Sequence, residues 1–261
     1  MIVILCHPDD VAALWLSETL QQLGVDGVEL VAVEQLVFSR RIVYHLSGDG
    51  DSGRIELADG RVLRPETISG LVNRIQYLPT QHFANADPAD RNYAAAELSA
   101  FVLAWINGVG GRVINPALPF ALGGGGFQMP TLVQLASMAG LPTVPWRAST
   151  ADVGPPEGGH HVGPSEAGHY FGPPEGGPYI STHAGIVFDG RLFGPLLPRG
   201  LQDACRQLAV LLGVPLLQVM LHQSPGLGWR FVNATGSVDF RIGGKPLALA
   251  IGRALARRIA A

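Results

Sequence analysis

The sequence predicts an α/β protein with an N-terminal Rossmann-like lobe, a C-terminal α+β lobe and a repeat between them. Residues 2–6 form a continuous apolar run, typical of a strand buried in a parallel sheet. A helix at 12–23 and a strand at 28–33 complete a βαβ opening. Residues 154–177 contain the pattern Gly-Pro-x-Glu-x-Gly three times, and each copy begins a nine-residue unit. Glycine and proline recur there too often for a helical turn, so turns and short extended pieces are expected.

Apolar periodicity and turn residues place the remaining elements. In chain order we expect a strand and hairpin at 42–63, a strand at 68–75, a helix at 90–107, a strand at 113–116, a helix at 130–139, a hairpin at 185–193, a helix at 201–212, strands at 216–221 and 230–233, and a helix at 246–259. Tyr93, Leu98, Phe101 and Trp105 are expected on the inner side of their helix. The glycine run at 123–126 lacks the ending of a phosphate loop and is interpreted as a flexible connector.

Composition restricts the class of protein. The 261 residues and 47% hydrophobic content suit a well-packed protein that folds without disulfides, so Cys6 and Cys205 are expected as core thiols in a cytoplasmic protein. A net charge of −3 gives no basic face for nucleic acid or an acidic membrane. The apolar N-terminal run is far shorter than the roughly 20 residues that span a bilayer. Lys245 is the only lysine.

Three stretches together resemble the ATP-grasp ligases, especially the peptide-modifying microviridin-type and RimK-like enzymes. They are Val72-Asn73-Arg74 with the helix at 90–107 and Val113-Ile114-Asn115-Pro116; Gln134-Leu135-Ala136 with Ala139-Gly140-Leu141-Pro142; and Trp229-Arg-Phe-Val-Asn233 with Gly243-Gly-Lys-Pro-Leu. The resemblance implies a pre-ATP-grasp lobe at 1–116, a connecting helix and strand at 117–153, the repeat arm at 154–184 and a C-terminal ATP-grasp lobe at 185–261. It also implies a residual nucleotide cleft at Asn233, Arg230, Arg147, Asp239 and Arg241.

The departures from the family pattern predict a pseudo-enzyme. The family uses lysines on the ATP phosphates, and Gln128-Met129 stands where one is usual. The family's Glu-x-Asn magnesium ligands are Phe231-Val232-Asn233 here. The repeat occupies the place of the middle lobe. We therefore expect no cofactor, and a role in binding a peptide or a partner biosynthetic enzyme, with a homodimer left open.

Two enzymatic alternatives stay open. An active ATP-dependent carboxylate–amine ligase would use Mg²⁺ and ATP, with Arg74, Arg147 or Arg230 in place of the phosphate lysines. A metal-dependent hydrolase would use His7, Asp9 and Asp10, which resemble the His-Pro-Asp-Asp-Glu motif of zinc deacetylases, although Val11 replaces the acidic base. The competing interpretation of this segment is a strand-end turn with an aspartate helix cap, which capping preferences favour.

The repeat has three interpretations of its own. Its polar residues are simply solvated on a stiffened surface arm, which compositional bias alone explains. Alternatively His160, His161 and His169 hold a metal with nearby glutamates. In the third interpretation Tyr170, Phe171 and Tyr179 anchor a partner.

Overall fold

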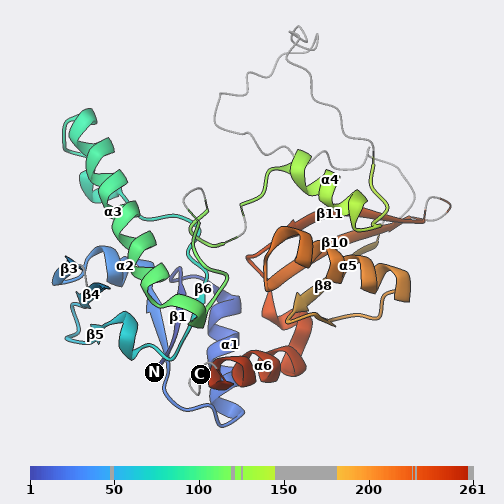
Figure 1. Cartoon of the computed structure of the whole chain (residues 1–261), viewed down its shortest axis with the longest axis horizontal. Helices are drawn as coiled ribbons and strands as arrows, with labels where there is room; N and C mark the ends of the chain where they lie inside the picture. The colour runs from blue at the N-terminus through green and yellow to red at the C-terminus, as the bar shows by residue number, and fades with distance from the viewer. Residues whose placement is uncertain are drawn as a thin grey trace, which may run out of the picture.

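The computed structural model describes residues 1–47, 50–118, 121–124, 126–144, 181–224, 226 and 228–257. Within these ranges a parallel sheet and an antiparallel sheet form two lobes, and a small third sheet lies at one end of the molecule (Figure 1). The predicted fold class, a Rossmann-like lobe followed by an α+β lobe, is confirmed. The triple repeat lies outside the described residues.

The first sheet is parallel and has the strand order β2-β1-β6-β7. Its strands are β1 (Ile2–Cys6), β2 (Val28–Ala32), β6 (Gly70–Asn73) and β7 (Val113–Ile114). Every residue of β1 is buried, as expected for a strand covered on both faces. Helix α1 (Val11–Gln22) returns the chain from β1 to β2, which confirms the βαβ opening.

The long helix α3 (Pro88–Gly108) and the small sheet cover one face of the parallel sheet. The small sheet consists of β3 (Arg41–Ser47), β4 (Gly50–Glu56) and β5 (Val62–Leu63). The N-terminal lobe also contains α2 (Val33–Val37) and the short helices η1 (Pro65–Thr67), η2 (Gln81–Phe83) and η3 (Gly110–Arg112). Trp105 is fully buried, and Leu98 and Phe101 pack against the core as predicted. The prediction for Tyr93 is wrong, because that half of α3 projects beyond the sheet and leaves the side chain 69% exposed (Figure 1).

The second sheet is antiparallel and has the strand order β11-β10-β8-β9. Its elements are β8 (Ser181–Phe188), β9 (Arg191–Phe193), β10 (Leu216–Ser224) and β11 (Gly228–Thr235), and the helices α4 (Met129–Met138) and α5 (Arg199–Leu212) pack on one of its faces. The second core lies between that face and the two helices. Leu217, Val219 and Leu221 of β10 are completely buried there.

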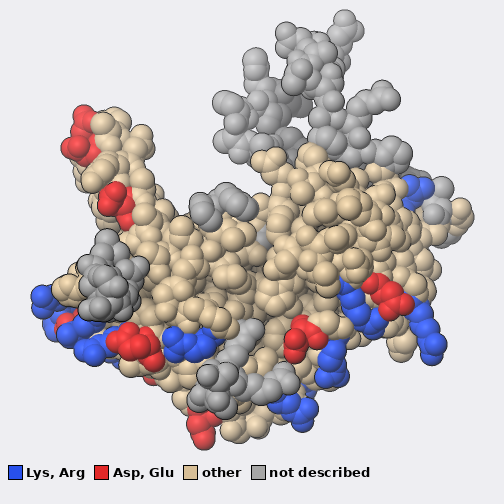
Figure 2. All heavy atoms as spheres, in the orientation of Figure 1, with Lys and Arg blue, Asp and Glu red and all other residues tan. Residues whose placement is uncertain are grey.

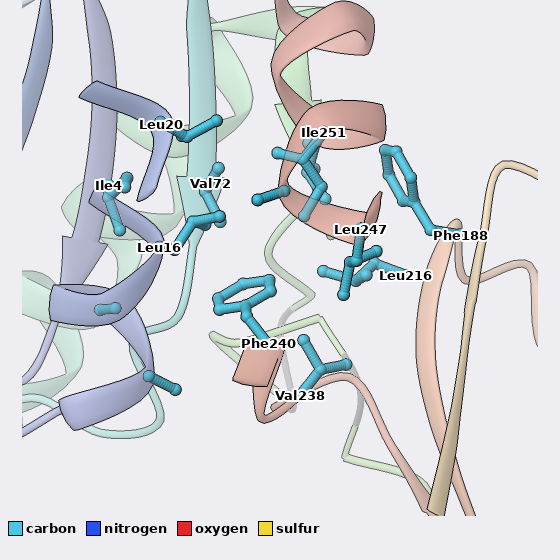
Figure 3. Packing of buried hydrophobic residues seen from close by; sticks show 14 of the residues in the cluster. Ile4, Leu16, Leu20, Val72, Phe188, Leu216, Val238, Phe240, Leu247 and Ile251 are labelled. Atoms are coloured by element: carbon cyan, nitrogen blue, oxygen red, sulfur yellow. The ribbon is translucent and has the colours of Figure 1, made fainter. Parts of the chain in front are cut away.

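Helix α6 (Phe240–Arg257) joins the two lobes. Its residues Phe240, Leu247 and Ile251 lie between α1 with the parallel sheet on one side and Phe188 with Leu216 of the antiparallel sheet on the other (Figure 3). The helix is kinked at Gly244, where φ is 60°, and its second part begins next to Pro246, the residue at which the predicted helix started. Because one hydrophobic core contains residues of both lobes, α6 holds them as one unit.

Asn115 makes a polar connection between the same two lobes. It follows β7 in the left-handed conformation, with φ 57°, and its side chain is buried. Its Nδ2 donates to the carbonyls of Leu216 at 2.9 Å and Gly236 at 3.0 Å, while its Oδ1 accepts from the Leu216 N–H at 3.2 Å. A short asparagine side chain tolerates this backbone conformation, and the three hydrogen bonds fix it.

The individual elements from 2 to 116 and from 130 to 139, and those from 185 to 257, are present with shifts in their ends, whereas the described part of 117–153 contains no strand of the kind expected there. Helix α2 and the short η helices were not predicted, because segments of three to five residues carry too little periodicity. At Gly123 and Gly124 the glycine run lies close to neighbouring backbone atoms. A Cβ on Gly124 would lie 2.7 Å from the Pro116 carbonyl oxygen, and one on Gly123 would lie 2.9 Å from that of Ile75. These glycines permit a close backbone approach.

Both cysteines are free and buried, as predicted. Burial raises the pKa of Cys6 to about 11 and that of Cys205 to about 12. Among the described helices, none has the length and apolar character to span a bilayer.

Candidate functional site

The candidate site is the face of the antiparallel sheet that points away from α4 and α5. Side chains alternate between the two faces of a strand. Since Leu217, Val219 and Leu221 face the helices, Met220 and His222 lie on the opposite face. Their partners on β11 are Asn233 and Arg230. All four of these opposite-face side chains are half-buried, so they line a surface that is neither core nor fully solvated.

A β-bulge in β11 decides which side chains reach this open face. The register passes from Met220 opposite Asn233 to Leu221 opposite Phe231, so Val232 is an extra residue. A bulge of this kind re-aims the side chains on either side of it. Phe231 therefore turns into the core under α4 and α5, where it is 5% exposed. Its N–H donates to the Pro142 carbonyl at 2.6 Å.

The open face carries a cation and an amide but no acidic side chain. Strands β8, β10 and β11 contain no aspartate or glutamate. The Nε of Arg230 is buried and has no hydrogen-bond partner among the described residues. The Asn233 Oδ1 accepts from the N–H of Ala234 at 2.8 Å, which leaves its amide nitrogen for other partners. Such a face can receive an anion or a peptide carbonyl, but it offers no carboxylate to a hard cation.

Asp239 and Arg241 lie just beyond β11 and pair with each other. The Asp239 carboxylate accepts from Arg241 Nε at 2.8 Å and from Nη2 at 2.7 Å. These side-chain hydrogen bonds hold the pKa of Asp239 below its ordinary value. The backbone N–H of Asp239 donates to Gln218 Oε1 at 2.8 Å, which anchors the turn to the open face. Their assignment to a nucleotide cleft stays a prediction.

Arg74 does not serve as a free phosphate ligand in this structure. It forms a bidentate ion pair with Asp10, in which Nε donates to Oδ2 at 2.7 Å and Nη2 donates to Oδ1 at 2.9 Å. Its Nη1 donates to the Val238 carbonyl at 2.7 Å, and its guanidinium lies 4.8 Å from the centre of the Phe240 ring. The side chain is only 7% exposed. Arg74 thus ties β6 to α1 and to the start of α6.

The three residues of the hydrolase hypothesis are not arranged as metal ligands. His7 Nε2 accepts from the Gln76 N–H at 3.1 Å, and its ring stacks on Tyr77 at 4.3 Å. Asp10 caps α1 through Ala13 N and also pairs with Arg74, while Asp9 is exposed. Within the described ranges no cluster of three or more His, Cys, Asp or Glu side chains is placed to hold a metal. At Asp10 the structure shows the helix cap.

A small polar pocket lies beside the open face, where the two lobes meet. It has a volume of about 160 Å³, and Gln76, Gly123, Thr235 and Ser237 are among its lining residues. Sequence reasoning missed this pocket, because its walls come from segments more than a hundred residues apart. The remaining predicted site residues lie outside the described residues: Arg147, His160, His161, His169, Tyr170, Phe171 and Tyr179.

The fold of this chain is similar to those of several solved structures. The structure is similar to macrocyclase MdnC from Microcystis aeruginosa, bound with the precursor peptide MdnA, with a TM-score of 0.70 and 12% identity over 98% of this chain and 100% of that chain. It is also similar to the ATP-grasp ligase PsnB, complexed with a minimal precursor, Mg and ADP, with a TM-score of 0.63 and 17% identity over 99% of this chain and 97% of that chain. This chain has the ATP-grasp fold.

A third structure with this likeness is the RiPP-associated ATP-grasp ligase of Chryseobacterium gregarium, in complex with ADP and a leader and core peptide. Its TM-score is 0.63 at 9% identity, over 99% of this chain and 97% of that chain. No protein-family model and no curated protein matches the sequence. The resemblance predicted from three short stretches is confirmed for the ATP-grasp fold. At these identities the likeness concerns the fold and not the reaction.

Proposed function

We propose that this ATP-grasp-fold protein binds a peptide, or a partner enzyme, in a peptide-modification pathway, and that it does not itself use ATP to join a carboxylate to an amine. The peptide part is supported by three structures of the same fold, whose bound molecules include precursor peptides or a leader and core peptide. The non-catalytic part is supported by the residues of the open face and by the scarcity of lysine.

The observation that carries the non-catalytic part is the position of Phe231. The family resemblance aligns it with a magnesium carboxylate, and here the ring is inserted into the core under α4 and α5. Mg²⁺ is usually held by one or two carboxylates together with phosphate oxygens, because it is a hard cation. Without acidic residues in β8, β10 and β11, the open face supplies no such ligand. Lys245, the only lysine, is exposed at the start of the second part of α6.

Calorimetry of the full chain with ATP and Mg²⁺ tests the absence of nucleotide use. We expect no saturable heat at micromolar protein concentrations. A micromolar affinity for ATP that disappears in Asn233→Ala would overturn the proposal. The matched control is Gln223→Ala, since Gln223 is an exposed amide residue of β10 outside the open face.

The peptide-binding part needs a separate experiment. Synthetic precursor-like peptides encoded beside this protein would be titrated against the full chain, and fluorescence anisotropy would report binding. We expect saturable binding that does not change when ATP and Mg²⁺ are added. A chain lacking residues 154–177 shows whether the repeat contributes. Absence of binding to every such peptide and to every enzyme encoded with it would contradict the proposal.

One observation favours a second candidate, an active ligase in which arginine replaces the phosphate lysines. Arg230 lies on the open face with Asn233, and its buried Nε has no partner among the described residues. Guanidinium groups bind phosphate through paired hydrogen bonds. This candidate predicts peptide-dependent release of ADP that is lost in Arg230→Gln. The proposed function predicts no ADP release from either protein.

A further inference from the structure

The small sheet of the N-terminal lobe presents a basic face that the proposed function does not use. In the antiparallel pair of β3 and β4, Arg41 lies opposite Glu56 and Val43 opposite Arg54. The pair of β4 and β5 places Ile55 opposite Leu63, so Arg64, one residue further, comes alongside Arg54. Ile55 faces the core and is fully buried. Because side chains alternate, Arg41, Arg54 and Arg64 all lie on the outer face.

Two like charges directly across neighbouring strands destabilise a sheet. Arg54 and Arg64 occupy such positions, and Arg54 has only a loose contact with Glu56, at 3.4 Å. In the part of the chain that the structure describes, the guanidinium groups of Arg41 and Arg64 take part in no ion pair or hydrogen bond. The basic face therefore has donors that lack an acceptor within the protein.

These side chains converge on one pocket. It has a volume of about 310 Å³, and its walls include Arg41, Arg54 and Arg64 together with His45 and Glu66. The three arginines are opposed by Glu66 in the pocket wall and by Glu56, which contacts Arg54 on the same face, so one positive charge remains in surplus when His45 is neutral. The whole protein, by contrast, has a net charge of −3. Figure 2 shows several blue side chains, with red ones among them, at the end of the molecule where β3, β4 and β5 lie.

The floor of the pocket is held in place by the core behind it. Gly53 belongs to β4, and a Cβ there would lie 2.9 Å from the Trp105 ring of α3 and 3.1 Å from the Tyr44 ring. The strand thus lies directly on a fully buried tryptophan. Val43 contributes an apolar wall between the arginines. Arg41 and Arg54 project from strands with a defined register, and Arg64 follows β5 directly in an extended conformation.

We propose that this pocket is a binding site for a small dianion, a phosphate monoester or a dicarboxylate. The guanidinium group forms paired, charge-assisted hydrogen bonds with either kind of oxyanion. A volume of about 310 Å³ lies at the low end of the range of small-molecule sites, which is roughly 300–1,000 Å³. Among the described residues the guanidinium groups of Arg41 and Arg64 have no partner, so they are available for the oxygens of a dianion. The site is separate from the open face of the antiparallel sheet, since its walls come from the small sheet of the N-terminal lobe.

Isothermal titration calorimetry of the full chain with inorganic phosphate, and separately with succinate, tests this site at constant ionic strength. We expect saturable 1:1 binding of at least one probe, and the tighter probe identifies the group that the natural ligand carries. In the double variant Arg41→Gln/Arg64→Gln, the Kd should rise about tenfold or more, since two charge-assisted contacts are lost. Both arginines are exposed, so the variant should fold.

The matched control is Arg199→Gln/Arg253→Gln, which removes the same charge from exposed positions elsewhere. Its Kd should stay within about twofold of the original protein, because exposed charges further apart than the Debye length of about 8–10 Å are largely screened. The bound probe should also raise the melting temperature of the original protein but not that of Arg41→Gln/Arg64→Gln. No saturable binding of either probe, or an equal loss of affinity in the control variant, would overturn the proposal.

Discussion

Replacing Arg74 by methionine should destabilise this protein far more than removing an exposed arginine, because it leaves the Asp10 carboxylate buried without its partner. Arg74 and Asp10 are 7% and 13% exposed, so neither charge can be fully hydrated alone. Arg74→Met also removes the donor to the Val238 carbonyl and the cation above the Phe240 ring. The perturbation therefore acts at the contact between the parallel sheet and the beginning of α6.

The magnitude follows from the burial of the pair. Breaking a buried ion pair by removing one partner costs about 3–5 kcal/mol. Asp10→Asn keeps a side chain that caps α1, because Asn and Asp are about equal as N-cap residues. The free energy of unfolding lost in Asp10→Asn therefore comes from the unpaired Arg74. In the double variant Asp10→Asn/Arg74→Met no unpaired charge remains. The double variant should lose about 2–3 kcal/mol less free energy of unfolding than the sum of the losses in the two single variants.

Urea unfolding followed by circular dichroism measures these differences, provided that the slope with urea stays constant among the variants. The control is the exposed pair of Asp203 and Arg206, whose side chains are 75% and 36% exposed. The same substitutions there should change the free energy of unfolding by no more than about 1 kcal/mol. A coupling between Asp10 and Arg74 below about 0.5 kcal/mol would refute the assignment of Arg74 to an internal ion pair.

Three further predictions concern single residues. Phe231→Glu should lower the free energy of unfolding by at least about 3–5 kcal/mol in urea titrations, and calorimetry should detect no gain of Mg²⁺ binding, because the side chain enters a core. The Cys205 thiol, with its pKa raised to about 12 by burial, should resist iodoacetamide at pH 8 until the protein is unfolded. The pKa of Asp239 is lowered, so its pairing with Arg241 stabilises the folded protein at pH values above the ordinary aspartate pKa near 3.8. This stabilisation is lost as the pH falls through the lower pKa of the folded state. In Arg241→Gln, NMR titration should show that the pKa of Asp239 moves upward.

The elements that sequence reasoning predicted share one property, which is that their signals are local. The apolar run of β1, the helical spacing in α5 and the turn at Asp189-Gly190 each lie within a few residues. Tyr93 was assigned to a core because periodicity gives the face of a helix but not how far the neighbouring sheet extends along it. Helix α3 extends beyond the edge of the sheet, so the side chains of its first turns face solvent.

The parts that could not be predicted depend on residues far apart in the chain. Arg74 and Asp10 are separated by 64 positions, and Asn115 meets Leu216 across 101 positions. An arginine next to a buried strand is compatible equally with a phosphate site and with an internal ion pair. Only the fold brings Asp10 within 2.7 Å and so decides between them.

The bulge in β11 bears on the predicted replacement of a magnesium carboxylate at Phe231. The resemblance to the ATP-grasp ligases suggests one substitution, an aromatic ring in place of a metal ligand. The structure adds that Phe231 lies on the other face of the sheet from Arg230 and Asn233, which are on the open face. Restoring a magnesium site at this position would require both an acidic residue and a changed register, because a glutamate in the present register would point into the core.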